Sequence, residues 1–165
     1  MKDAKYWIEK LEMLPHPEGG YFKETYRSSE IINEKHLPER FTGDRNISTS
    51  IYYLLQNEDC SKLHRIKSDE MWHFYDGSGL IIYEINNQGI LIENKLGLDF
   101  NTNESPQILI KDGNWFGAKV IKPNSFCLAG CTVSPGFDFA DFEFGNREKL
   151  LSEFPEHKEI ILQLT

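Results

Sequence analysis

The spacing of apolar residues divides the chain into a β-rich middle and two helical ends. Near the N-terminus, the segment WIEKLEML repeats apolar residues three or four positions apart, and Asp3 stands where a helix N-cap is expected. This pattern predicts a helix over residues 3–13, which a pair of prolines ends. Helical spacing returns over residues 146–165, with Asn146 as the cap.

Between these ends, short apolar and aromatic segments are separated by Gly, Pro, Asn or Asp. Roughly nine or ten such segments follow Ser48, which is typical of an all-β sandwich or barrel. A further strand is expected in YFKETYRS, after a turn at the EGG sequence, whereas residues 31–46 are polar and predict a long loop or hairpin excursion. We therefore expect one domain over residues 1–165, with a barrel core over about 18–145.

Two adjacent segments of this core, LHRIK and EMWHF, carry the most informative chemistry. Strand alternation places His64 and Ile66 on one face of the first segment, and Glu70 and Trp72 on one face of the second. A short turn between the segments would bring these faces to the same side of a hairpin. His64 and Glu70 would then point into the barrel, where each needs a partner: the other residue, a metal or a ligand.

The composition of the chain limits the kinds of partner that we expect. A net charge of -8 and a pI near 5.1 argue against nucleic acid and anionic membranes. No apolar run approaches the roughly 18 residues of a membrane span, and the N-terminus lacks a signal-peptide core. We expect a cytoplasmic protein. Its three cysteines cannot all pair, and Cys127 and Cys131 are expected to be core packing residues.

Other polar residues are expected to have ordinary roles. His16 lies in a polar segment and is expected at the surface. Asp138 and Asp141 follow a Pro-Gly turn, so we expect solvated carboxylates. The alternative is that these two residues close the barrel mouth or pair with Arg27.

The stretch HRIKSDEMWHFYDG resembles the first motif of the cupin superfamily. His64 matches the first metal-binding histidine, Glu70 the glutamate and Gly77 the closing glycine, whereas Ile66 replaces the second histidine. Downstream, GAKVIKPNSFCL resembles the second motif, with Leu128 where that motif has its histidine. Half of the superfamily's usual metal ligands are therefore missing.

Four blocks in order resemble one small cupin branch, the cupin_5 type, which is classed as a domain of unknown function. These blocks are HPEGGYFKETYRS, STSIYYLL, SDEMWHFYDG and GCTVSPGFDFADFEF. The resemblance implies a cupin jelly-roll (a double-stranded β-helix) with short terminal helices, a homodimer, and a fold similar to that of the dTDP-sugar 3,5-epimerases.

The resemblance favours a small-molecule ligand inside the barrel, such as a sugar or a nucleotide-linked sugar, and an epimerase or isomerase if the protein is an enzyme. His64 would be the base and Glu70 its partner, because a histidine oriented by a carboxylate suits proton abstraction next to a carbonyl. One of Tyr21, Tyr52 or Tyr75 would return the proton. Arg27 and Arg65 would hold a phosphate or carboxylate.

Two alternatives stay open. One is a metal-dependent enzyme in which His64 and Glu70 hold a divalent metal; we expect no cofactor, because two protein ligands are fewer than catalytic zinc sites use. The other is a binding protein without catalysis. Its ligand would be held by aromatic and polar side chains. The residues proposed for ligand binding are Tyr21, Phe22, Arg27, Ser50, Tyr52, Arg65, Trp72 and Trp115.

Overall fold

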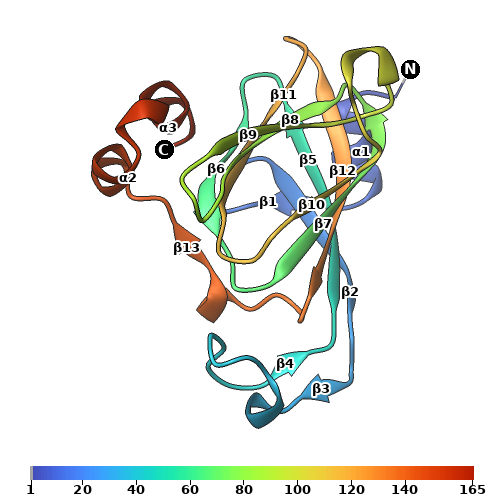
Figure 1. The fold of residues 1–165 in the computed structure, drawn as a ribbon. Coiled ribbons are helices and arrows are strands. Elements are labelled where there is room, and N and C mark those ends of the chain that lie inside the picture. The colour runs from blue at the N-terminus through green and yellow to red at the C-terminus, as the bar shows by residue number, and fades with distance from the viewer. Residues whose placement is uncertain (1) are drawn as a thin grey trace.

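The computed structural model describes residues 2–165 and contains two antiparallel sheets packed face to face, with helices at both ends of the chain (Figure 1). The predicted all-β class with short terminal helices is confirmed. Within these residues, no helix is long and apolar enough to cross a membrane.

The larger sheet has six strands in the order β1-β2-β5-β12-β7-β10. Its central strand β12 pairs with β5 on one side and β7 on the other, so three segments far apart in sequence lie side by side. The strands span Leu14–Pro15 (β1), Tyr21–Arg27 (β2), Thr49–Gln56 (β5), Asp69–Gly77 (β7), Gln107–Ile110 (β10) and Phe126–Ser134 (β12).

The smaller sheet has five strands in the order β13-β6-β11-β8-β9. These strands span Cys60–Arg65 (β6), Leu80–Ile85 (β8), Leu91–Leu96 (β9), Trp115–Val120 (β11) and Glu143–Phe144 (β13). The remaining elements are the two-stranded ribbon Ile31–Ile32 (β3) and Arg45–Asn46 (β4), the helices Ala4–Lys10 (α1), Arg147–Glu153 (α2) and Lys158–Leu164 (α3), and the 3-10 turns Glu34–His36 (η1), Phe100–Thr102 (η2), Phe139–Asp141 (η3) and Pro155–His157 (η4).

The main core lies between the sheets and follows the two-residue period of the strands. In β12, Cys127 and Cys131 face this core, as their apolar setting predicted, and they are free thiols. Leu128 points to the opposite face of the sheet, where it packs with Leu54 beneath α1. The position that the second cupin motif assigns to a metal-binding histidine therefore faces away from the barrel interior.

The terminal helices cover the outer faces of the two sheets. Helix α1 starts as predicted at Asp3, whose carboxylate accepts a hydrogen bond from the Tyr6 backbone, and it packs on the six-stranded sheet. Helix α2 likewise begins after Asn146, which caps the Lys149 amide. Together with α3 it covers the five-stranded sheet (Figure 1).

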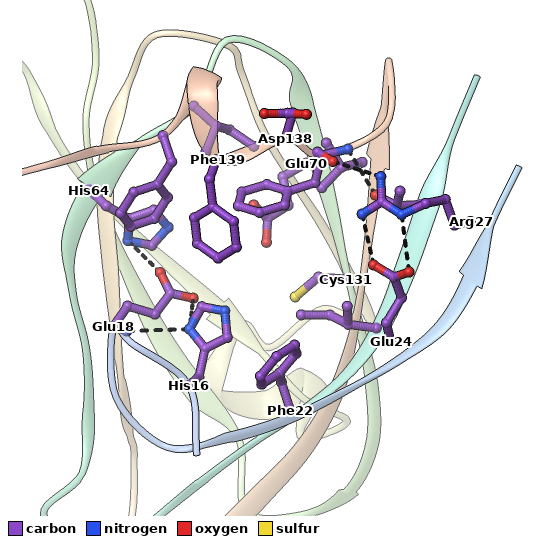
Figure 2. Close-up of a pocket in the computed structure, with 16 residues that line it drawn as sticks. His16, Glu18, Phe22, Glu24, Arg27, His64, Glu70, Cys131, Asp138 and Phe139 are labelled. Carbon is purple, nitrogen blue, oxygen red and sulfur yellow. Dashed lines mark hydrogen bonds and ion pairs between the residues drawn. The ribbon is translucent and has the colours of Figure 1, made fainter. Parts of the chain in front are cut away.

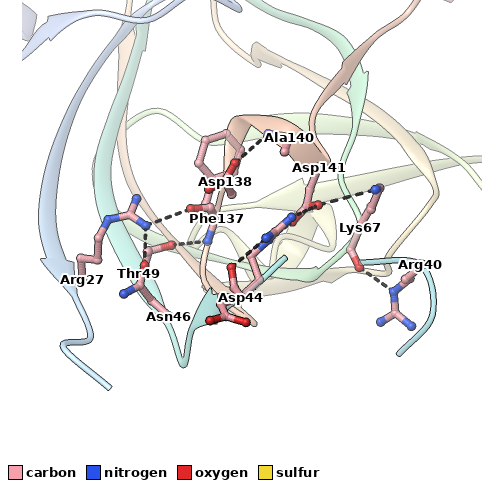
Figure 3. Close-up of polar contacts among 11 residues, drawn as sticks. Arg27, Arg40, Asp44, Asn46, Thr49, Lys67, Phe137, Asp138, Ala140 and Asp141 are labelled. Carbon is pink, nitrogen blue, oxygen red and sulfur yellow. Dashed lines mark hydrogen bonds and ion pairs between the residues drawn. The ribbon is translucent and has the colours of Figure 1, made fainter. Parts of the chain in front are cut away.

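The excursion over residues 31–46 is ordered by a buried ion pair. The Arg45 guanidinium donates two hydrogen bonds of 2.7 Å to the Asp141 carboxylate, and both side chains are less than 5% exposed (Figure 3). Lys67 adds a weaker contact at 3.7 Å from Asp141. The prediction that Asp141 is a solvated turn carboxylate is wrong, because its partner Arg45 lies far away in sequence.

We expect Asp141→Ala to destabilise the fold by about 3 kcal/mol, because it leaves the Arg45 charge buried without its partner. The comparison variant is Glu9→Ala, which removes an exposed pair with Lys5 and should lower the free energy of unfolding by less than about 0.5 kcal/mol. Urea unfolding of both variants measures the difference. Equal losses in the two variants would contradict a structural role for the Arg45–Asp141 pair.

Candidate active site

A cavity of about 290 Å³ opens at one end of the barrel, between the two sheets (Figure 2). Its walls come from β2, β5, β6, β7 and β12, from the turn before β2, and from the segment after β12. Polar side chains gather in two places on opposite sheets. One group surrounds His64 on β6, and the other surrounds Glu70 on β7.

The first group is a buried ion pair between His64 and Glu18. His64 Nδ1 lies 2.9 Å from Glu18 Oε2, and the two side chains are 3% and 9% exposed. Burial alone would raise the pKa of Glu18, but the charge of His64 outweighs it and holds that pKa below its ordinary value. Glu18 is therefore an anion inside the barrel, compensated by an imidazole.

A double-glycine turn places Glu18 at this point. Gly19 and Gly20 have φ values of 118° and 67°, and a Cβ on either would collide with backbone, at Cys60 and Leu54 respectively. The turn is held by backbone hydrogen bonds, including one of 2.9 Å from Lys62 N to Glu18 O. The EGG sequence thus forms the predicted turn, and its close approach to β6 brings the Glu18 carboxylate to His64.

The orientation of His64 is fixed on its Nδ1 side. Nδ1 is 2.7 Å from the Lys62 carbonyl oxygen, so it carries the proton, while Nε2 makes no hydrogen bond within residues 2–165. The ring packs between Phe116 and Phe142, at centroid distances of 4.1 and 5.1 Å. Nε2 is thereby the available nitrogen of a ring that cannot easily turn.

The pKa of His64 reflects two opposing effects. Burial would lower the pKa, but the carboxylates of Glu18 and Glu70 outweigh burial and raise it above the ordinary value of 6.5. The neighbouring His16 also contacts Glu18, with Nδ1 at 3.2 Å from Oε1. Burial dominates there, so the pKa of His16 is lowered.

Glu70 forms the second polar group, on the facing sheet. It is 8% exposed, and burial raises its pKa to about 7, further assisted by the negative charge of Glu18. The Cys131 thiol also lines the cavity, and burial raises the pKa of that thiol well above its usual value. Near neutral pH, Glu70 is thus partly a neutral carboxylic acid.

Four of the residues predicted for the site line the cavity: His64, Glu70, Phe22 and Arg27. The expected pairing of His64 with Glu70 is not what the structure shows. The carboxylate in contact with His64 is Glu18 instead, because the glycine turn carries it against β6.

Three predicted residues lie on the outer face of the six-stranded sheet, because their strand neighbours Phe22, Thr49 and Ile51 point into the cavity. Ser50 approaches Thr132, Tyr52 packs edge-on against Tyr75, and Tyr21 packs beneath α1. None of the three tyrosines considered as proton donors lines the cavity.

The other three predicted residues lie elsewhere in the fold. Trp72 is buried in the main core against Tyr53, and Trp115 packs in the cluster beneath α2 and α3. Arg65 lies over the Trp115 ring and pairs with Glu143. None of the three lines the cavity.

Glu18 and His16 are the site residues that sequence reasoning missed. His16 was expected at the surface, but its side chain is 9% exposed and faces the cavity. The available signal was the pair of glycines directly after Glu18, which indicates a close backbone approach. The sequence does not say which strand the turn approaches, because that depends on contacts between segments far apart in the chain.

The donor set does not fit a cupin metal centre. Within residues 2–165, no group of three or more His, Cys, Asp or Glu side chains is placed to hold a metal ion. Ile66 lines the cavity where a second imidazole would stand, and Leu128 faces α1. The Nδ1 edge of His64 is already directed to Lys62 and Glu18.

Comparison with known proteins agrees with this architecture. The model of the cupin superfamily family Cupin_5 (DUF985) matches residues 5–145. The chain belongs to the Cupin_5 family. This member is also 32% identical over 149 residues to the uncharacterized protein YML079W of Saccharomyces cerevisiae, covering 83% of this chain and 72% of that protein.

Solved structures extend the comparison. Protein SO0799 from Shewanella oneidensis superposes with a TM-score of 0.90 at 39% identity, covering 100% of this Cupin_5 chain and 98% of that one. A hypothetical protein from Leishmania major gives 0.88 at 31% identity, with 99% of each chain covered. Oxalate decarboxylase from Bacillus subtilis gives 0.55 at 15% identity, covering 92% of this chain and 36% of that chain, a likeness of fold alone.

We expect Glu70→Gln to stabilise this Cupin_5 protein at alkaline pH. A folded pKa of about 7 against an ordinary 4.5 means that the folded state loses stability as pH rises through this interval. Relative to wild type, the variant should gain about 3 kcal/mol between pH 4.5 and 8.5, because each pKa difference of one is about 1.4 kcal/mol. Urea unfolding over this pH range measures the gain.

Glu18→Gln should change the free energy of unfolding in the opposite direction. Since the pKa of Glu18 is lowered, its ionised form contributes stability above pH 4.5, and the variant should be less stable than wild type there. Stability curves of wild type and Glu70→Gln that stay parallel from pH 4.5 to 8.5 would show that Glu70 has an ordinary pKa.

Proposed function

We propose that this protein binds a small carbonyl compound in the barrel cavity and moves a proton at the carbon next to the carbonyl, as an epimerase or isomerase does. The observation that carries the proposal is the pair of titratable groups on facing sheets. His64 is held by Glu18, and Glu70 has a pKa of about 7. Two such groups on opposite sides of a cavity suit general acid–base catalysis.

His64 is the base in this proposal. Its Nδ1 edge is fixed by the Lys62 carbonyl and by Glu18, which leaves Nε2 to accept a proton. The Glu18 carboxylate, which faces Nδ1, stabilises the imidazolium that forms when Nε2 of the neutral ring takes the proton. Glu18 is a positioning residue, because it acts through His64.

Glu70 is the acid. Burial keeps a fraction of its carboxyl protonated near neutral pH, so it can donate a proton to the carbonyl oxygen or to the carbon face opposite His64. This role replaces the tyrosines, which lie outside the cavity. The rate should therefore be bell-shaped in pH, with its maximum near neutrality.

The remaining walls suit a ligand of sugar size. Phe22, Phe137, Phe139 and Phe142 line the cavity and offer apolar faces for a ring. The volume of about 290 Å³ is at the small end for ligand sites. We therefore propose a ligand closer to a monosaccharide than to an entire nucleotide-linked sugar.

The direct test is exchange of deuterium from D₂O into a panel of ketoses, aldoses and hydroxyketones, followed by proton NMR. Wild type should catalyse exchange at the carbon next to the carbonyl of at least one compound. His64→Asn should lower that rate by about 10²- to 10⁴-fold, since a general base is removed.

The matched control is His73→Asn, because His73 bonds Thr132 and Gln107 and does not line the cavity. Its rate should stay within about twofold of wild type. The proposal fails if no compound exchanges with wild type, or if His64→Asn retains full activity.

Glu18→Gln separates a positioning role from a structural one. Without the Glu18 charge the pKa of His64 falls, so the acid limb of the pH–rate profile should move to lower pH. The maximal rate should also drop by about tenfold, because the imidazolium loses its partner. An unshifted acid limb would show that Glu18 does not tune His64.

A further inference from the structure

We propose that the cavity selects an uncharged ligand, with an apolar ring face and hydroxyl or carbonyl groups, and excludes phosphate and carboxylate groups. This inference names the substrate class of the proposed site and so rests on the proposed function. Sequence reasoning assigned Arg27 to anion binding. The contacts of Arg27 point to a different role (Figure 2).

The Arg27 guanidinium is already occupied. Nε and Nη2 donate to the two oxygens of Glu24 at 3.1 and 2.8 Å. Nη1 donates to Asn46 Oδ1 at 2.9 Å and to the Phe137 carbonyl oxygen at 3.0 Å (Figure 3). These bonds direct most N–H groups of the cation to protein atoms rather than to the cavity.

Those contacts identify Arg27 as a clamp on the aromatic segment after β12. Besides the Arg27 bond to the Phe137 carbonyl, the Phe137 amide donates to Thr49 Oγ1 at 2.9 Å. Phe137 and Phe139 then pack edge-on at 5.0 Å and form one apolar wall. The guanidinium is used to hold this wall.

The other charges on the cavity wall are compensated or of the wrong sign for an anion. Glu18 is paired with His64, and Glu24 is paired with Arg27. Asp138 accepts from the Ala140 amide and lies in the field of Arg27. Among the described residues that line the cavity, both cationic side chains, Arg27 and His64, face carboxylates, so an entering phosphate would be repelled.

The buried Glu70 side chain also disfavours an anionic ligand. It has no cationic partner at hydrogen-bond distance within residues 2–165, and burial raises its pKa to about 7. A ligand anion beside it would add a second negative charge to a buried site. A neutral carbonyl can instead accept from the protonated carboxyl, and a neutral hydroxyl can also donate to the ionised one.

The experiment measures uptake of two ionic probes, inorganic phosphate and methylammonium, by methyl NMR at constant ionic strength. The reporters are the methyl groups of Ile51, Ile66 and Val133, which line the cavity. Wild type should show no saturable shift with either ion. Saturation of these methyls by either ion with a Kd below about 10 mM would overturn the proposal.

Variants that remove one charge of the Glu24–Arg27 pair should bind an ion that wild type excludes. Glu24→Gln removes the charge that compensates Arg27 and one of its two acceptor oxygens, so the variant should bind phosphate at least about tenfold tighter than wild type, a change of about 1.4 kcal/mol. Arg27→Gln leaves the Glu24 carboxylate without its cation and should bind methylammonium instead. The double variant removes both charges and should reject both ions.

The side chains of Glu24 and Arg27 are 42% and 38% exposed, so these variants should fold. The same methyl spectra report whether they are folded. If Glu24→Gln gains no phosphate binding, Arg27 is not a masked anion site and the proposal is overturned. Ion uptake requires no turnover. A failure here is therefore distinct from a failure of the proposed proton transfer, which the deuterium exchange reports.

Discussion

The site depends on one constraint, the close approach of the Gly19–Gly20 turn to strand β6. A Cβ on Gly19 would collide with Cys60 of β6, and a Cβ on Gly20 would collide with Leu54 of β5. Only glycines therefore allow the close approach that brings Glu18 against His64. Burying an anion in this way is stable only because His64 compensates it. From this pair follow the fixed ring of His64, its raised pKa and, through the negative charge of Glu18, part of the raised pKa of Glu70.

A second polar system supports the opposite wall. Arg45 and Asp141 anchor the β3–β4 excursion to η3, while Arg27 ties the same segment to β2 (Figure 3). The aromatic wall of the cavity is thus fixed by arginines whose N–H groups bond protein atoms. Both arginines serve packing, and this leaves the cavity chemistry to imidazole and carboxyl groups.

Local patterns in the sequence predicted much of this fold. The helix caps at Asp3 and Asn146, the strand periods and the inward faces of His64 and Glu70 depend on neighbours in sequence, and they were predicted correctly. Glu18 was missed because its partner is set by tertiary contact. Ser50 and Tyr52 were placed on the wrong face because the phase of β5 alternation depends on its register with β2 and β12.

One cavity holds a histidine whose pKa is raised above 6.5 and a carboxyl group whose pKa is about 7. Direct NMR titration of the His64 ring nitrogens and the Glu70 carboxyl carbon in the folded protein tests both pKa values. The structure predicts a His64 pKa above 6.5, with the proton of the neutral ring on Nδ1, and a Glu70 pKa of about 7. A Glu70 that titrates near 4.5, or a His64 pKa below 6.5, would contradict the acid–base site.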